Sequence, residues 1–364
     1  MSEPRPTPLH KVHEELGASL TDFAGWLMPL RYGSETAEHQ AVRTAAGLFD
    51  LSHMGEIEVH GAAAADLLDY ALVGHLSKLG QGRARYTMIC DADGGVLDDL
   101  IVYRIDDDDF LVVANAANHD VVLTALTERA AGFDTTVTDR TDEWALLAVQ
   151  GPRTVEILRR LTDAPLDDLK YYSSHAATVA GHPVLLARTG YTGEDGFELF
   201  ARPDAAVPLW SALTEAGTPV GLRPAGLASR DTLRLEAGMP LYGNELSREV
   251  TPYEAGLGRV VKLEKPGDFV GKAALAVRSD EGPRQTLIGL VGQGRRVPRH
   301  GYPVLRDGVA CGFVTSGAPS PTLGRPIAMA YVDSADAPGE LAVDVRGKPE
   351  PADQVDLPFY RRAR

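Results

Sequence analysis

Two adjacent carboxylates in the segment GGVLDDLIVYRI (Gly94–Ile105) are the first candidates for chemistry, because they lie inside a strand-like apolar pattern. Side chains of a strand alternate between its two faces. Asp98 therefore shares a face with the charged Arg104, whereas Asp99 shares a face with Tyr103 and otherwise aliphatic residues. A carboxylate on an apolar face costs free energy unless it is hydrogen-bonded or used. We therefore predict that Asp99 is the costlier of the two acids and has a function.

A second candidate is the glycine-rich stretch RTGYTGEDGFEL (Arg188–Leu199), which has three glycines within seven residues. Glycine allows sharp turns and close backbone approach. The stretch ends in a predicted strand on which Glu198 faces away from its apolar neighbours Phe197 and Leu199. It matches neither a dinucleotide-binding fingerprint nor a phosphate-binding loop of the Walker type, so we do not expect a nucleotide site.

A third candidate is the group Arg230, Asp231 and Arg234, which has helical spacing within the mostly small and apolar stretch Gly221–Leu246. These charges could form a surface ion pair of little energetic consequence. A guanidinium among small residues would equally suit a ligand carboxylate, because arginine offers two parallel donors. The pattern by itself leaves both interpretations open.

The sequence gives little support for other kinds of catalytic site. There is no GxSxG nucleophile motif, and the ten histidines are scattered without metal-ligand spacing. His53, in DLSHMGE, is better explained by a local structural hydrogen bond than by catalysis. Cys90 and Cys311 form neither a disulfide framework nor a metal cluster, and their apolar contexts indicate reduced, structural cysteines.

The elements that must position these residues show a weak internal repeat. Gly55–Leu72 and Trp144–Leu161 both read as strand, glycine and amphipathic helix, with Gly61 and Gly151 at equivalent points. Such units predict an α+β fold, with helices packed on antiparallel sheets in two related α/β lobes.

The pattern changes after about residue 275, where short β-rich runs alternate with turns that contain glycine or proline. A small all-β barrel or sandwich is expected there, with a boundary near Ser279–Pro283. We therefore predict a first region of residues 1–275, with one lobe at roughly 52–140, and a C-terminal barrel domain at 280–364.

The composition of the 364 residues is that of an ordinary globular protein, with 44% hydrophobic and 24% charged residues. The formal net charge of −15 argues against non-specific nucleic-acid binding, which requires an excess of basic residues. The start of the chain lacks the pattern of a signal peptide, and no run reaches the ~18 apolar residues of a membrane span. We expect a cytoplasmic location with no membrane partner.

Taken together, these stretches resemble the T-protein of the glycine cleavage system, a tetrahydrofolate-dependent aminomethyltransferase. The resemblance covers nearly the whole chain, and several motifs in one order are far more specific than any single motif. The matching stretches are DFAGWLMPLRY, GLFDLSHMGE, GGVLDDLIVY, VVANAAN, LLAVQGP, RTGYTGEDGFEL, AGLASRDTLRLEAGMPLYGNEL, VTSGAPSPTLG and PFYR.

The resemblance implies a reaction with two partners and no metal. An aminomethyl group on the lipoyl arm of H-protein passes to tetrahydrofolate, giving 5,10-methylenetetrahydrofolate, ammonia and dihydrolipoyl H-protein. Tetrahydrofolate is thus an acceptor substrate, expected in a central hole among three domains. H-proteins of this system tend to be acidic, so we expect a local basic patch for docking that includes Arg295, Arg296 and Arg299.

The resemblance also assigns site residues. Asp99 matches the second Asp of the family's DD pair, which faces the reacting nitrogens of the folate; Asp98 supports it. Glu198 would accept the pterin edge in bidentate fashion. Arg230 matches the family's ligand-contacting arginine and suits the anionic glutamate tail, with Arg361 as a second cation.

The remaining carried-over positions are aromatic, polarizable or amide side chains, which suit the rings and polar edges of a folate. They are Met54, Tyr86, Tyr103, Asn115, Tyr172 and Tyr191. Arg259 and Met239 depart from many relatives, which leaves fine contacts open. For mechanism, we expect Asp99 to orient the folate, to accept or relay a proton, and to stabilise the iminium-like carbon left after ammonia departs.

Two other functions share this scaffold. Folate-dependent O- or S-demethylases are similar in fold, but the intact RTGYTGEDGFEL and LEAGMPLYGNEL stretches favour the T-protein. A non-catalytic folate-binding protein linked to iron–sulfur assembly would carry a Lys-Gly-Cys-Tyr segment near the pocket, and this chain has no cysteine there.

Overall fold

The structure, a computed structural model, describes residues 3–333 and 337–363. The chain divides into two compact units. The first unit comprises the residues up to 71 together with 75–87 and 100–230, and the second comprises 72–74, 88–99 and the residues from 231 onward. Among the described residues, no helix is long and apolar enough to cross a membrane.

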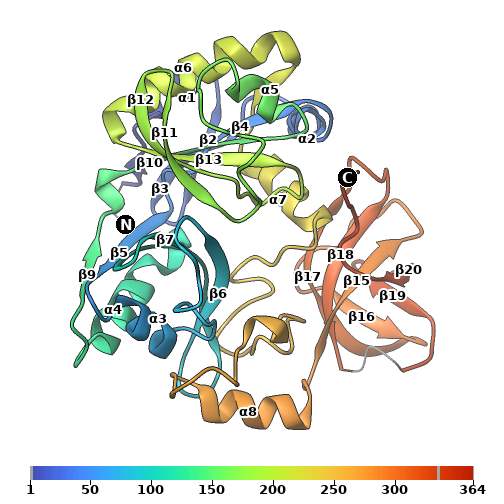
Figure 1. The fold of residues 1–364 in the computed structure, drawn as a ribbon. Coiled ribbons are helices and arrows are strands. Elements are labelled where there is room, and N and C mark those ends of the chain that lie inside the picture. Colours follow the sequence, from blue (N-terminus) through green and yellow to red (C-terminus); the bar gives the residue numbers. More distant parts are fainter. Residues whose placement is uncertain (1–2, 334–336, 364) are drawn as a thin grey trace. The chain divides into compact units, whose positions relative to one another are not determined.

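One sheet of the first unit has five strands in the order β6-β7-β8-β5-β9 (Figure 1). The turn-proximal parts of β6 and β7, residues 88–90 and 96–99, belong to the second unit. Antiparallel pairing joins β5 to β8 and β9, and joins β7 to β8. The elements are β5 (Gly55–His60), β6 (Ala84–Cys90), β7 (Val96–Asp106), β8 (Asp109–Ala114) and β9 (Thr136–Asp139), with α3 (Ala64–Ala71) and α4 (His119–Arg129).

The other large sheet has six strands in the order β11-β12-β13-β10-β4-β14. Its strand β14 is parallel to β4, so this sheet is mixed rather than wholly antiparallel, as the long connection between these two strands permits. The elements are β4 (Ala46–Asp50), β10 (Ala145–Gln150), β11 (Ser174–Val179), β12 (His182–Ala187), β13 (Gly196–Ala201) and β14 (Leu222–Pro224), with α2 (Glu35–Thr44), α5 (Thr154–Leu158) and α6 (Ala206–Gly217).

A small sheet in the order β1-β3-β2 completes the strands of the first unit, and short 3₁₀ helices connect several elements. The small sheet consists of β1 (Arg5–Pro6), β2 (Ser19–Phe23) and β3 (Trp26–Arg31), with α1 (His10–Glu15) beside it in sequence. The 3₁₀ helices of the chain are Ala116–Asn118, Thr141–Glu143, Pro203–Ala205, Thr218–Val220 and Gly258–Val260.

The predicted internal repeat is present in both large sheets. Gly61 follows β5 with φ +139°, and Gly151 follows β10 with φ +138°. A Cβ atom at either glycine would lie 2.5 Å from a backbone carbonyl oxygen, that of Asp134 or Ala45. Because only glycine fits both the backbone angle and the close approach, the two strand-to-helix turns are equivalent. This confirms the two related α/β lobes.

The core of the six-stranded sheet depends on the amphipathic helix α6. Ala206, Leu209, Trp210 and Leu213 are all buried, at the i, i+3, i+4 and i+7 spacing that places side chains on one helix face. They pack in the same apolar cluster as Leu147 of β10. The burial of this stripe holds the helix on the sheet that carries β13 and Glu198.

The second unit contains a closed six-stranded barrel, with strands in the order β15-β18-β17-β16-β19-β20 and antiparallel pairing throughout. Of the two architectures predicted for this region, a barrel and a sandwich, the structure has the barrel. Its strands are β15 (Thr286–Gly292), β16 (Pro303–Arg306), β17 (Val309–Pro319), β18 (Pro326–Val332), β19 (Leu341–Asp344) and β20 (Pro349–Val355), preceded by α7 (Leu227–Glu236) and α8 (Lys272–Glu281).

Candidate functional site

Glu198 is the centre of a buried hydrogen-bond cluster in the first unit. Its Oε2 atom accepts hydrogen bonds from the Tyr103 hydroxyl, at 3.2 Å, and from the Thr189 hydroxyl. The Tyr103 and Thr189 oxygens are themselves 2.9 Å apart. Tyr103 comes from β7 and Glu198 from β13, so the cluster joins the two large sheets. Two hydroxyl groups, one from the distant Tyr103 and one from the nearby Thr189, thus fix the carboxylate in place.

The cluster leaves one oxygen of the carboxylate available. Among the described residues, none donates a hydrogen bond to Oε1 of Glu198. Burial and the nearby Glu198 charge raise the pKa of Tyr103 well above its usual value, with Tyr172 adding to the shift. Tyr103 therefore keeps its proton and acts as a donor. A carboxylate held on one oxygen and open on the other can accept a hydrogen bond from a ligand donor.

The buried side chain of Gln150 packs against the loop before β13 and fixes its backbone. Gln150 donates to the Thr189 carbonyl at 3.0 Å and accepts from the Thr192 hydroxyl at 2.9 Å. A Cβ atom at Gly190 or Gly196 would collide with the Gln150 amide. The glycines are therefore required so that this amide can pack against the loop, which explains the glycine-rich motif without a bound phosphate.

Two ion pairs complete the loop. Arg188 binds Asp195 through two contacts of 3.0 and 2.6 Å, and Arg43 binds Glu194 at 3.0 Å. Arg43 also donates to the Thr192 carbonyl at 2.8 Å. Both ion pairs stabilise the loop. The loop therefore holds Thr189 and Tyr191 in one arrangement beside Glu198 of β13.

Arg230 and Arg234 have different environments, which separates the two interpretations of their segment. The Arg230 guanidinium lies 4.8 Å from the ring centroid of Tyr191, and loss of water around it lowers its pKa despite the nearby Tyr191 and Glu198. Arg234 is buried in the second unit, where it contacts Asp231, Glu245 at 2.8 Å and the Ser316 hydroxyl at 2.7 Å. The expected ion pair between Asp231 and Arg234 is therefore present, but Arg234 is buried rather than at the surface and has a structural role.

His53 is a member of the site that sequence reasoning did not place there. It is 3% exposed, and its Nδ1 atom has no hydrogen-bond partner among the described residues. Burial, together with the positive charge of Arg230, lowers its pKa to about 4. A structural hydrogen bond was expected for this histidine, and none is made by Nδ1 among the described residues; with its lowered pKa the ring is neutral at physiological pH. The sequence around His53, from Asp50 to Met54, did not indicate that this histidine belongs to the site.

The turn that leads to Asp99 belongs to the second unit and is built differently. Asp91 Oδ1 accepts hydrogen bonds from the backbone of Asp93 at 3.0 Å and of Gly95 at 2.9 Å. Gly95 packs so closely against the Arg248 carbonyl that no Cβ would fit. The Val96 amide then donates to the carbonyls of residues 247 and 250. The start of β7 is therefore braced by backbone contacts on both sides.

The burial of the two aspartates differs from the expectation. Asp98 is 0% exposed, whereas Asp99 is partly exposed. The prediction that Asp99 is the costlier of the two acids is therefore wrong, because it is Asp98 that is withdrawn from water. Tyr242 lies close enough for the Asp98 charge to raise its pKa, together with burial, against the effect of Arg248. Asp98 is thus an interior group and Asp99 is accessible.

The first unit holds eight of the ten predicted site residues. Electrostatic or direct contacts connect Tyr103, Tyr172, Tyr191, Glu198 and Arg230. Met54, Tyr86 and Asn115 are partly exposed, as a ligand-lining side chain must be. Asp99 and the exposed Arg361 lie in the second unit. Thr189 and Gln150 complete the site but were not predicted, although both lie within the quoted motifs.

The described residues contain no group of three or more His, Cys, Asp or Glu side chains that could hold a metal ion. The contacts of Glu198, Tyr103 and Arg230 suit recognition of a flat polar ligand, and carboxylates can also stabilise positive charge.

Comparison with known proteins gives consistent results over the whole chain. Residues 9–265 match the family described as GCVT N-terminal domain, and residues 285–361 match the glycine cleavage T-protein C-terminal barrel domain. The chain is 66% identical to an aminomethyltransferase of Streptomyces avermitilis, covering 99% of this chain and 98% of that protein. It is 45% identical to an aminomethyltransferase of Bacillus subtilis, covering 98% and 99%.

A solved structure agrees with these matches. The crystal structure of glycine cleavage system aminomethyltransferase T from Bartonella henselae superposes with a TM-score of 0.91 at 36% identity, and the match covers 98% of each chain. The fold described above, with its two lobes and its C-terminal barrel, is therefore that of this solved protein.

Proposed function

Because the chain belongs to the glycine cleavage T-protein family and is an aminomethyltransferase, we propose that it transfers the aminomethyl carbon from the lipoyl arm of H-protein to tetrahydrofolate. The products are 5,10-methylenetetrahydrofolate, ammonia and dihydrolipoyl H-protein. The carbon exchanges its bonds to the lipoyl sulfur and to the amine nitrogen for bonds to two folate nitrogens, N5 and N10. The two protons that these nitrogens release go to the departing ammonia and to the restored thiol, so the step needs no oxidant.

The observation that carries this proposal is the geometry of Glu198. A pterin edge presents an amine and a ring N–H side by side, which a carboxylate can accept. Tyr103 and Thr189 occupy Oε2 and leave Oε1 without a donor. The tyrosine rings of the cluster and the Arg230–Tyr191 stack offer flat surfaces for the pterin and benzoyl rings. The ligand class that fits this set is a reduced folate.

In this proposal, Asp99 is the residue that acts on the reacting atoms. A partly exposed carboxylate can meet the folate nitrogens, accept or relay their proton, and stabilise the iminium-like carbon after ammonia leaves. Asp98 is fully buried, so we assign it a supporting role rather than contact with the substrate.

The deciding experiment mixes the protein with aminomethylated H-protein, with and without tetrahydrofolate, and follows ammonia release. Release that depends on the protein and rises with tetrahydrofolate supports the transferase. Tight folate binding without stimulated release would instead identify a folate-binding protein, and the proposal would be abandoned. Asp99→Asn provides the matched inactive variant, since it keeps the side-chain shape and removes the charge.

H-protein docking is the second part of the proposal. Arg295 and Arg299 are exposed and form no ion pair among the described residues, whereas Arg296 binds Glu350 at 2.9 Å. Two unpaired arginines on a net acidic chain are available to an acidic partner. Reversing them with Arg295→Glu and Arg299→Glu should raise the KM for H-protein and leave the KM for tetrahydrofolate unchanged. An unchanged KM for H-protein would place docking elsewhere.

A further inference from the structure

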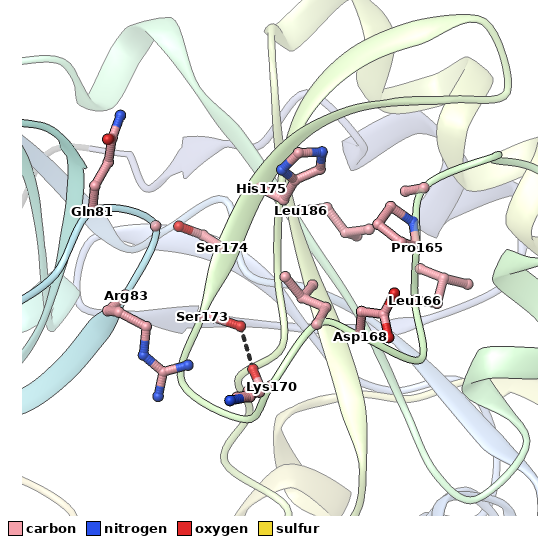
Figure 2. A pocket seen from close by; sticks show the side chains of 13 residues that line it. Gln81, Arg83, Pro165, Leu166, Asp168, Lys170, Ser173, Ser174, His175 and Leu186 are labelled. Atoms are coloured by element: carbon pink, nitrogen blue, oxygen red, sulfur yellow. Dashed lines mark hydrogen bonds between the residues drawn. The ribbon is translucent and has the colours of Figure 1, made fainter.

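Two pockets of the first unit border strand β11. One, of about 340 Å³, lies between the loop before β6 and the start of β11 (Figure 2). Its leucines, Leu166 and Leu186, are already buried. Its charged residues Arg83, Lys170 and Asp168 have both signs. This pocket therefore does not indicate one class of ligand.

The second pocket has a volume of about 430 Å³, and we call it the Trp144 pocket. This volume lies in the range that is usual for small-molecule sites. One wall comes from the five-stranded sheet, and the other comes from the six-stranded sheet and the residues at the ends of its strands. The lining residues used below are Glu58, Asp109, Trp144, Ala176, Leu185 and Arg202.

Apolar side chains of the Trp144 pocket still expose surface. Trp144 and Leu185 are half-buried, and Ala176 is exposed. Ala176 and Leu185 are directly opposite each other on β11 and β12, so they lie on one face of the sheet. Removing apolar surface from water is favourable. A ligand with an apolar body would therefore gain free energy by covering this wall, which a small inorganic ion could not do.

The charged residues of the Trp144 pocket are paired, except for one carboxylate. Glu58 pairs with Arg140 at 3.0 Å, and Arg202 pairs with Glu143 at 2.9 Å. The Asp109 carboxylate forms no hydrogen bond or ion pair among the described residues. Burial and the neighbouring Glu58 charge raise its pKa, because the negative charge is not compensated there. A cation in the pocket would compensate Asp109 and leave both existing pairs intact.

Strand alternation directs the Asp109 side chain to the pocket face of its sheet. Glu58 and Leu111 are opposite each other on β5 and β8, and both line the pocket. Asp109 is two residues from Leu111 on β8, so its side chain shares that face. The three preceding residues, Asp106–Asp108, are exposed, whereas Asp109 is half-buried. The fold thus separates Asp109 from the solvated turn next to it.

The Trp144 pocket is next to the Glu198 cluster but does not overlap it. The ring centroids of Trp144 and Phe200 are 6.3 Å apart, and those of Phe200 and Tyr103 are 5.4 Å apart. Phe200 is 0% exposed, so its ring fills the space between the two places. Neither Glu198 nor Thr189 lines the pocket. A ligand of the pocket is therefore distinct from a ligand of Glu198.

We propose that the Trp144 pocket binds an organic ammonium ion that carries an apolar body. The Asp109 carboxylate accepts its N–H groups, because hydrogen bonds between charged partners are short and strong. The face of an indole ring attracts a cation, so Trp144 suits the ammonium group as well as the body, and Leu185 packs against the body. The transfer reaction does not use this site, so the proposal does not rest on the proposed function.

Calorimetry tests the charge requirement with three probes that share one aromatic body: phenethylamine, phenethyl alcohol and phenylacetate. Each is titrated into the wild type, Asp109→Asn and Asp108→Asn. Asp108→Asn is the matched control, because it removes the same charge from an exposed neighbour that does not line the pocket. The fluorescence of the three tryptophans is followed in parallel, and Trp144→Phe identifies the part that comes from Trp144.

We expect the wild type to bind phenethylamine with a Kd of about 0.1–1 mM, and the alcohol and phenylacetate about tenfold more weakly or less. Asp109→Asn should weaken binding of the amine by about tenfold and leave that of the alcohol unchanged, since only a charge-assisted contact is lost. Asp108→Asn should keep the wild-type Kd. The amine should change the fluorescence of the wild type but not that of Trp144→Phe.

Equal binding of the amine and the alcohol overturns the proposal, and so does an Asp109→Asn variant that keeps the wild-type Kd for the amine. The absence of binding at about 10 mM phenethylamine has the same consequence.

A further titration uses Glu198→Gln, and the wild type saturated with tetrahydrofolate. Both should bind the amine as the untreated wild type does. Loss of binding in either would place the amine at the Glu198 cluster and end the proposal. None of these measurements needs turnover, so their outcome is separate from that of the transferase test.

Discussion

The regions around Asp99 and Glu198 each present one carboxylate, but the two are built in opposite ways. Glu198 is buried, and two hydroxyl donors hold it. Asp99 is partly exposed at the start of a strand that backbone contacts brace from both sides. A carboxylate with fixed donors is prepared for recognition, and an accessible one is prepared for charge stabilisation. The difference is consistent with the roles proposed above, in which the first region binds the ligand and the second carries out the chemistry.

The largest effect should come from Asp99→Asn. Loss of a proton acceptor and of its negative charge should reduce kcat by about 10²–10⁴-fold, with the KM for tetrahydrofolate nearly unchanged. Steady-state measurement of ammonia release with saturating aminomethylated H-protein separates the two constants. Near-full turnover by this variant would remove Asp99 from the mechanism and end the division of roles.

The stability of the folded chain should depend on pH through His53, which lies in the first unit with Glu198. The pKa of His53 is about 4 in the folded chain, against 6.5 for an ordinary histidine. Between these values the unfolded state binds a proton that the folded state does not, so stability falls as the pH drops from 6.5 to 4 and is constant from this cause above 6.5. The shift corresponds to about 3 kcal/mol.

Denaturant unfolding of the wild type and of His53→Gln over that pH range measures this contribution. The variant should lose less stability on acidification, since it lacks the buried ring. Parallel stability curves for the two proteins would show that His53 is not held neutral by burial and Arg230.

Glu198→Gln should act on binding rather than on turnover. The neutral amide keeps the shape, but it loses a charge-assisted acceptor that is worth about 1.5–3 kcal/mol. We expect the KM for tetrahydrofolate to rise by roughly 10–100-fold, with kcat reduced much less. Calorimetry with the folate alone gives the same comparison without turnover. A variant whose kcat falls as far as that of Asp99→Asn would contradict the separation of recognition from chemistry.

The smallest effect should follow from Tyr103→Phe, which removes one donor to Glu198 and leaves the carboxylate in contact with Thr189. Loss of one hydrogen bond of this kind costs about 0.5–1.5 kcal/mol. The KM should therefore rise by only about two- to tenfold. Thr189→Val is the matched variant for the other donor, and the double variant shows whether the two hydroxyls act together. An unchanged KM in the double variant would show that Glu198 does not depend on its donors.

The sequence determined those features that depend on local pattern. Gly61 and Gly151 marked the two equivalent strand-to-helix turns, and the change of pattern after about residue 275 marked the C-terminal barrel. The ordered motifs identified the family, which the comparisons confirm. Local steric limits and side-chain periodicity act within a few residues, so they can be read without the fold.

The tertiary structure alone decided the environment of each charged group. Alternation predicted Asp99 as the costlier acid, yet Asp98 is the buried one and lies close enough to Tyr242 to act on its pKa. Helical spacing treated Arg230 and Arg234 alike, yet one stacks on Tyr191 and the other is bound to Glu245. The reason is physical: burial and electrostatic partners come from chain segments tens to hundreds of residues away, and a local pattern does not contain them.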